Sequence, residues 1–154
     1  MDIINLQDYF VKKEFVFLAT SDLKGTPNVA PKFFLKQEDK TIYLIDYAFG
    51  KTLDNLRENP LASIAGMDIK SLTGYKMVGR IVIMEKGKLY ETLVQAVREK
   101  ELRLSVQRIA EGVRTQKKHA HFKLGLSGKV IIYKFTLKRL TVIQPGGEAT
   151  QKKL

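Results

Sequence analysis

The chain has 154 residues, a formal charge of +11 and no cysteine. This length suits one domain with its own hydrophobic core, and the missing cysteines exclude disulfides and thiolate metal sites. The excess of 27 Lys and Arg over 16 Asp and Glu favours an anionic partner: nucleic acid, a phosphorylated ligand or a membrane surface. No apolar run is long enough to span a membrane, and the N-terminus lacks a basic start. We therefore expect a cytoplasmic protein without a signal peptide or a membrane partner.

The first third of the chain predicts a short helix and three antiparallel strands. Apolar residues at helical spacing predict the helix over residues 3–13, and β-rich runs predict strands at 15–20, 28–36 and 41–47. Pro31 lies inside the second strand. Because proline cannot donate a hydrogen bond to a neighbouring strand, Pro31 indicates an edge, a bulge or a backbone that faces something other than a strand.

The stretch from Ile42 to Pro60 reads as a strand, a short loop, Lys51-Thr52 and an amphipathic helix. The first backbone N–H groups of a helix have no partner within it, and the helix dipole favours an anion there. Lys51 adds a positive charge. Thr52 adds a hydroxyl that can cap the helix or bind a phosphate oxygen. On these residues alone, an ordinary helix start with a solvated lysine is the simpler interpretation.

The rest of the chain predicts three more strands around one helical insertion. The β-rich runs lie at 61–67, 75–85 and 129–143. All the strands together predict a small barrel or sandwich formed by one domain over residues 1–145. A Pro-Gly-Gly run follows the last strand, and we expect the tail at 146–154 to be disordered.

The helical insertion at 88–118 has apolar residues on two nearly opposite sides of an ideal helix. A straight helix with one buried stripe does not produce this arrangement. We expect a break near residues 99–101; the alternative is one long helix that faces two partners, which would suit a helix reaching across a dimer. The two sets are Leu89, Leu93, Ala96, Val97 and Leu104, and Leu102, Val106, Ile109, Ala110 and Val113.

Several short motifs occur in a characteristic joint order between residues 15 and 85. They are Phe17-Leu18-Ala19-Thr20, Gly25-Thr26-Pro27, Asn28-Val29-Ala30-Pro31 and Gly50-Lys51-Thr52-Leu53-Asp54-Asn55-Leu56, the last followed by Asn59-Pro60. In this order the chain resembles the pyridoxamine 5′-phosphate oxidase-like, FMN-binding split-barrel family. The resemblance implies a mainly β fold with helices: a six-stranded antiparallel split β-barrel with a helical insertion before the last strand. It also implies a homodimer with FMN at the subunit interface, acting as a flavin-dependent oxidoreductase on a small-molecule substrate or electron donor.

The resemblance further implies a cofactor site built from three parts of the chain. The second-strand backbone would lie along the flavin and its phosphate side, and the end of the third strand would approach the isoalloxazine ring. The helix start would hold the phosphate, whose nearly two negative charges exceed what a helix dipole neutralises alone, so that Lys51 and Lys32 would supply the rest. No residue is assigned a catalytic role. The implied cofactor-binding residues are Ala30, Pro31, Lys32, Ile45, Asp46, Gly50, Lys51, Thr52 and Asn55.

The chain departs from the full oxidases at recognisable places. Those enzymes have an arginine where this chain has Ala30-Pro31 and a Ser-Arg-Lys triplet where it has Phe49-Gly50-Lys51. They also have a C-terminal Arg-x-His pattern, which is missing here. We therefore do not expect vitamin B6 oxidase activity.

Two alternatives compete with an FMN enzyme. The first keeps the fold but exchanges the cofactor for the deazaflavin F420 or for haem, with His119 or His121 as an iron ligand. The second is a non-enzymatic protein that binds nucleic acid or another anion through a basic helix face. For that face, solvation is a simpler explanation than a nucleic-acid partner. Its residues are Arg98, Arg103, Arg108, Arg114, Lys117 and Lys118.

Overall fold

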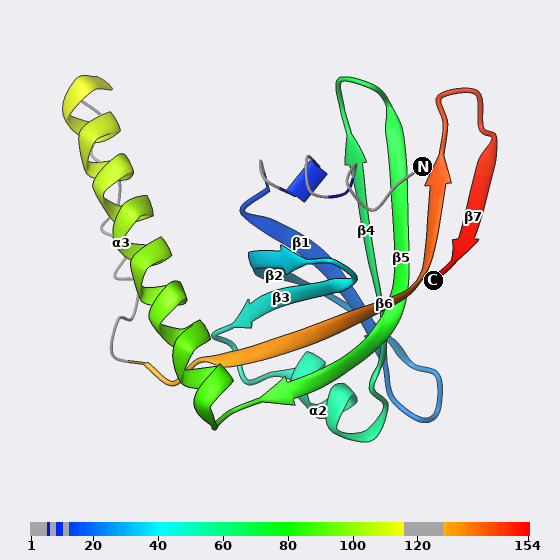
Figure 1. The fold of residues 1–154 in the computed structure, drawn as a ribbon, viewed down its shortest axis with the longest axis horizontal. Helices are drawn as coiled ribbons and strands as arrows, with labels where there is room; N and C mark the ends of the chain where they lie inside the picture. The colour runs from blue at the N-terminus through cyan, green and yellow to red at the C-terminus, as the bar shows by residue number, and fades with distance from the viewer. Residues whose placement is uncertain (1–5, 7–8, 11–12, 116–127) are drawn as a thin grey trace.

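The computed structural model describes residues 6, 9–10, 13–115 and 128–154. Seven strands and two long helical segments follow one another along the chain (Figure 1). The elements are β1 (Phe15–Ser21), β2 (Pro27–Glu38), β3 (Thr41–Asp46), α2 (Lys51–Glu58), β4 (Leu61–Asp68), β5 (Thr73–Met84), α3 (Lys88–Thr115), β6 (Ile131–Ile143) and β7 (Ala149–Lys153).

Six of the strands close into an antiparallel barrel. The strand order is β3-β2-β1-β4-β5-β6, and β3 also pairs with β6, which removes the open edges of the sheet. Alternate residues point inward and are buried because the side-chain period of a strand is two. The predicted mainly β fold, a six-stranded barrel with a helix inserted before its last strand, is confirmed. The interior includes Leu18, Leu44, Ile64, Met77, Tyr133 and Phe135.

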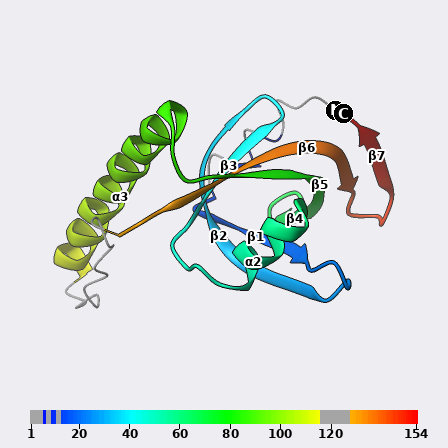
Figure 2. The same cartoon turned by 90° about the horizontal axis from the view of Figure 1, so that it is seen from below.

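Helix α2 lies across one end of the barrel (Figures 1 and 2). Leu53 and Leu56 turn toward the barrel core and are 3% and 4% exposed. Two helical residues near the N-terminus, Leu6 and Phe10, belong to the same core. The Phe10 ring stacks on Phe34 with a centroid distance of 5.0 Å. Helix α2 and the N-terminal helical residues therefore both contribute apolar side chains to the barrel core.

Helix α3 is one continuous helix of 28 residues, so the predicted break near residues 99–101 is wrong. Its first half packs Leu93 and Val97 against the outer face of the barrel, in a cluster with Tyr43, Ile45 and Ile132. The second half leans away from the barrel (Figure 1). The second apolar set is therefore unburied within one straight helix. Its exposed members are Leu102, Val106, Ile109 and Val113. No helix within the described residues is long and apolar enough to cross a membrane.

The C-terminal tail is ordered, in contrast to the predicted disorder of residues 146–154. Gly147 adopts a positive φ of 84° in a turn in which the Gln144 N–H donates to the Glu148 carbonyl at 2.8 Å. Strand β7 then pairs with β6 along its whole length. All five residues of β7 are exposed. The strand therefore lacks the alternating apolar pattern from which a strand is predicted.

Candidate cofactor site

The start of helix α2 is open. Gly50 is its N-cap, and no side chain caps the helix. The Gly50 carbonyl accepts from the N–H groups of Leu53 and Asp54, at 2.9 and 3.3 Å. Among the described residues, the N–H groups of Lys51 and Thr52 have no hydrogen-bond partner. Gly50 and Lys51 are exposed, and a side chain added at Gly50 would meet only the Ala48 carbonyl, at 4.0 Å. This helix start is accessible to an anion.

Two carboxylates bear on this opening, and one of them is Asp54 in the first turn of α2. Asp22, in the turn between β1 and β2, accepts from the N–H groups of Lys24 and Thr26, both at 2.9 Å. Its pKa is lowered first by the hydrogen bonds from Thr26, then by the one from Lys24, and last by the positive charge of Lys51. Asp22 and Lys51 therefore interact electrostatically across exposed surface.

Thr52 does not cap α2 but joins a buried polar cluster, formed by Thr20, Asn28, Thr52 and Asn55. The Asn28 amide donates to the hydroxyl oxygens of Thr20 and Thr52, at 3.2 and 3.1 Å. The Asn55 amide donates to Thr20 at 3.2 Å, while its own carbonyl oxygen is buried without a partner in the described chain. These bonds tie β1, β2 and α2 together. The predicted site lacks Thr20 and Asn28, although both lie in the motifs that carry the resemblance.

The polar cluster places part of β2 next to the start of α2. Asn28 contacts Thr52, and Ala30 and Pro31 follow it along the strand. At Pro31, β2 pairs with Phe17 of β1, whereas pairing with β3 begins only at Phe33. Pro31 therefore lies at a local strand edge, one of the three explanations that the sequence left open. This part of β2 is unpaired on its β3 side, and Asn28 ties the strand to Thr52 at the start of α2.

The end of β3 is closed by a buried charged network. The Lys32 ammonium lies 2.8 Å from the Asp46 carboxylate, and the two side chains are 6% and 3% exposed. The Tyr133 hydroxyl donates to the other Asp46 oxygen at 2.6 Å, and the Ala48 N–H donates to the first at 3.0 Å. Burial, followed by the hydrogen bond to Asp46, raises the pKa of Tyr133 well above its usual range. The charge of Lys32 is thus balanced inside the barrel and is not offered to a phosphate.

Ile45 points to the opposite side of β3, where α3 covers it. It is 2% exposed and lines a small apolar cavity between the barrel and the helix. The predicted site residues therefore fall into three groups. Gly50, Lys51, Thr52 and Asn55 lie together beside the Ala30–Pro31 edge, Lys32 and Asp46 pair inside the barrel, and Ile45 lies beneath α3. The cavity is lined by Phe33, Ile45, Tyr47, Val97, Lys100, Glu101, Leu104 and Arg108.

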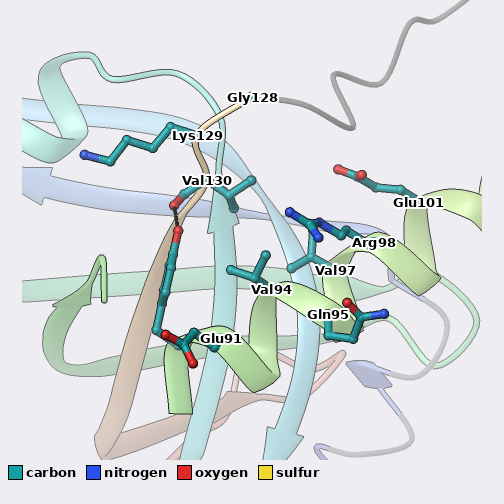
Figure 3. Close-up of a pocket in the computed structure, with 10 residues that line it drawn as sticks. Glu91, Val94, Gln95, Val97, Arg98, Glu101, Gly128, Lys129 and Val130 are labelled. Atoms are coloured by element: carbon teal, nitrogen blue, oxygen red, sulfur yellow. Dashed lines mark hydrogen bonds between the residues drawn. The ribbon is translucent and has the colours of Figure 1, made fainter. Parts of the chain in front are cut away.

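A larger cavity of about 320 Å³ lies between the start of α3 and the approach to β6 (Figure 3). Its wall carries charges of both signs, from Glu91, Arg98, Glu101 and Lys129. The Tyr90 hydroxyl closes one side by donating to the Val130 carbonyl at 2.7 Å. No residue of the predicted cofactor site lines this cavity, and no sequence motif pointed to it. His119 and His121, the proposed haem ligands, lie outside the described residues.

The sequence matches the family model of pyridoxamine 5′-phosphate oxidase over residues 5–121. The chain belongs to this family. The matched region begins before β1 and extends beyond α3, so it includes the start of α2 and the Lys32–Asp46 ion pair but not Tyr133. The family membership that the motifs suggested is confirmed. A search of curated protein sequences finds no match.

Solved structures share the fold across nearly the whole chain. A Clostridium acetobutylicum protein related to general stress protein 26, of the pyridoxinephosphate oxidase family, has a TM-score of 0.67 at 16% identity, covering 99% of this chain and 94% of that one. A pyridoxamine 5′-phosphate oxidase-related, FMN-binding protein from Nostoc punctiforme has a TM-score of 0.58 at 12% identity, covering 99% and 93%. HutZ, a haem storage protein from Vibrio cholerae, has a TM-score of 0.58 at 16% identity, covering 89% and 91%. At these identities the likeness establishes the fold alone.

Proposed function

We propose that this protein binds FMN with its phosphate at the start of α2 and acts as a flavin-dependent oxidoreductase on a small-molecule substrate or electron donor. The observation that carries the proposal is the uncapped helix start with the exposed Lys51, in a chain of the pyridoxamine 5′-phosphate oxidase family. The FMN-binding neighbour from Nostoc punctiforme supports the choice of cofactor.

The donor set at this site fits a phosphate. The N–H groups of Lys51 and Thr52 supply hydrogen bonds, the helix dipole contributes about half a positive charge, and the Lys51 ammonium a full one. Together these supply about 1.5 positive charges toward a phosphate dianion, and the negative charge of Asp22 opposes them. The Thr52 hydroxyl is buried with Asn28, so Thr52 would contribute its backbone.

The remaining residues would orient the cofactor. The edge of β2 at Ala30 and Pro31 would lie along the flavin, and the polar cluster would hold this edge against α2. FMN, when bound, supplies the redox chemistry, and the protein supplies position and electrostatics. No described side chain near the site is a clear acid or base, and we assign no catalytic residue.

We propose that the protein works as a homodimer with the cofactor at the subunit interface. The outer face of β1, β2 and β4 exposes five large apolar side chains, Phe15, Phe17, Val29, Leu61 and Met67, by 49%, 52%, 64%, 56% and 49%. Phe17 lies opposite Pro31, so a partner that covers this face would also border the β2 edge. Exposed apolar clusters of this kind typically mark an interface.

The dimer is tested by sedimentation of the protein and two glutamate variants. We expect a dimer for the unmodified chain and for Leu23→Glu, which places the same charge on an exposed apolar residue of the β1–β2 turn. Phe17→Glu should yield monomers that bind FMN weakly. A monomeric unmodified protein would contradict the interface.

The cofactor is tested by the absorption spectrum of the purified protein, followed by titration with FMN. We expect the flavin bands near 370 and 450 nm, or their appearance as a bound species on adding FMN to cofactor-free protein. A colourless protein that binds no added FMN would overturn the proposal.

Haem is the second candidate cofactor, supported by the similarity to the haem storage protein HutZ. The same spectrum separates it from flavin, because haem has an intense Soret band. Loss of that band on replacing His119 or His121 would assign the iron ligand. The open helix start does not decide between them, because a helix N-terminus accepts the carboxylates of haem as well as a phosphate.

A further inference from the structure

The turn between β3 and α2 is anchored from two directions. Inside the barrel, Asp46 accepts from the Ala48 N–H at 3.0 Å. The Ala48 carbonyl in turn accepts from the Gly50 N–H at 2.7 Å, so Asp46 is linked to the N-cap of α2. Outside the barrel, the Tyr47 hydroxyl donates to the carboxylate of Glu101 on α3. A turn of a few residues held at adjacent positions has little freedom to move.

Glu101 is unusual for its position in α3. The buried residues of this helix are Leu93, Val97 and Glu101, four residues apart on one face, and Glu101 is only 5% exposed. Burying a carboxylate is costly unless it is hydrogen-bonded. Tyr47 supplies that bond, and burial, followed by the bond to Glu101, raises the pKa of Tyr47 well above its usual range. Tyr47 therefore remains a neutral donor to Glu101.

Two further contacts fix this part of α3 to the barrel. The Lys100 ammonium donates to the Phe34 carbonyl of β2, and burial lowers the pKa of Lys100. Arg108 lies 3.9 Å from Glu14, just before β1. Helix α3 thus contacts β2 at Phe34, the residue before β1 and, through Glu101, the turn itself.

We propose that α3 positions the cofactor-binding turn through the Glu101–Tyr47 contact, which makes both of them positioning residues for the phosphate site. The inference rests on the proposed function, and it assigns a role to the helical insertion. Tyr47 lies between Asp46, which the barrel holds, and Ala48, which is hydrogen-bonded to the N-cap of α2. Losing the outer anchor frees the turn on one side and misaligns the N–H groups of Lys51 and Thr52.

The test compares three variants on one helix. Glu101→Ala removes the acceptor, Glu101→Gln retains an acceptor oxygen, and Glu99→Ala removes an exposed carboxylate as a control. We expect Glu101→Ala to weaken FMN affinity about tenfold, and the other two to change it less than about threefold. Tyr47→Phe removes the donor from the other side and should match Glu101→Ala.

Amide hydrogen exchange on the cofactor-free protein supplies a second readout. In Glu101→Ala and Tyr47→Phe, exchange over residues 46–53 should become faster relative to the amides of β5 and β6, which a uniform loss of stability would not produce. This ratio is measurable even if one variant is less stable than the original.

The outcomes separate this inference from the proposed function. If Lys51→Ala loses FMN affinity while Glu101→Ala and Tyr47→Phe retain it, the coupling is wrong and the phosphate site stands. If the unmodified protein binds no FMN, the proposed function fails, and the exchange ratio alone decides whether α3 holds the turn. An unchanged ratio in both variants overturns the inference.

Discussion

The start of α2 and the end of β3 are five residues apart in sequence and have opposite characters. A lysine lies at each of them: Lys32 of β2 contacts the end of β3, and Lys51 begins α2. Lys32 is buried against Asp46 at 2.8 Å, whereas Lys51 is exposed at an uncapped helix start. The Lys32–Asp46 ion pair between β2 and β3 balances its own charges and stabilises the fold. The helix start leaves its N–H donors without a partner among the described residues, and it is the phosphate site that we propose. The comparison teaches that a lysine indicates an anion site only when no carboxylate of the protein is paired with it.

The largest effect is expected from removing the buried ion pair between Lys32 and Asp46. Asp46→Ala leaves the Lys32 ammonium buried without a partner and removes the acceptor for Tyr133 and Ala48. We expect a loss of about 3–5 kcal/mol in the free energy of unfolding, measured by urea denaturation. A loss below about 1 kcal/mol would show that Lys32 reaches water and that this region is more open than described.

A smaller loss is expected from Tyr133→Phe, which removes one hydrogen bond but keeps the ion pair. We expect about 1–3 kcal/mol, because one Asp46 oxygen loses a buried donor. Tyr43→Phe is the matched control, since Tyr43 is also buried on the barrel wall and its hydroxyl has no hydrogen bond among the described residues. Equal losses for the two variants would argue against the network.

The smallest effect is expected from removing the negative charge of Asp22, which tests the electrostatics at the start of α2. Asp22→Asn keeps the acceptor for Lys24 and Thr26 but removes the negative charge near Lys51. We expect FMN affinity to rise by about twofold at low salt, and the gain to disappear at high salt because exposed charges are screened. The same titration at two salt concentrations checks this. A loss of affinity would show that Asp22 assists binding instead of opposing it.

The barrel was predictable because its strands alternate apolar and polar residues between short turns. The length of α3 was not, because its two apolar sets suggested two buried faces, and one of them is exposed. Strand β7 was missed because it has no buried face. In both cases, the prediction from sequence was wrong because burial does not follow the pattern of apolar residues.

The Lys32–Asp46 pair shows a second kind of limit. Counted from the Glu38–Thr41 pair at the hairpin turn, Lys32 would face Tyr47. A register shift between Phe34 and Lys36 instead sets Phe33 opposite Ile45, the last pair of β2 and β3, and the Lys32 ammonium reaches Asp46 just beyond it. One extra residue in a strand changes the cross-strand partner of every residue beyond it. No residue type in this stretch predicts the shift. The helix start at Lys51 was predictable from local sequence, whereas its assignment as a phosphate site came from the family resemblance and stays a prediction.

The central claim is that the start of α2 holds the phosphate of FMN. The most direct measurement compares the dissociation constants of FMN and riboflavin, which lacks the phosphate, for the unmodified protein and Lys51→Ala. We predict that the unmodified protein prefers FMN by about tenfold or more, and that Lys51→Ala removes most of this preference while stability changes by less than about 0.5 kcal/mol. Equal affinities for the two flavins in the unmodified protein, or a parallel loss of affinity and stability in the variant, would contradict the account.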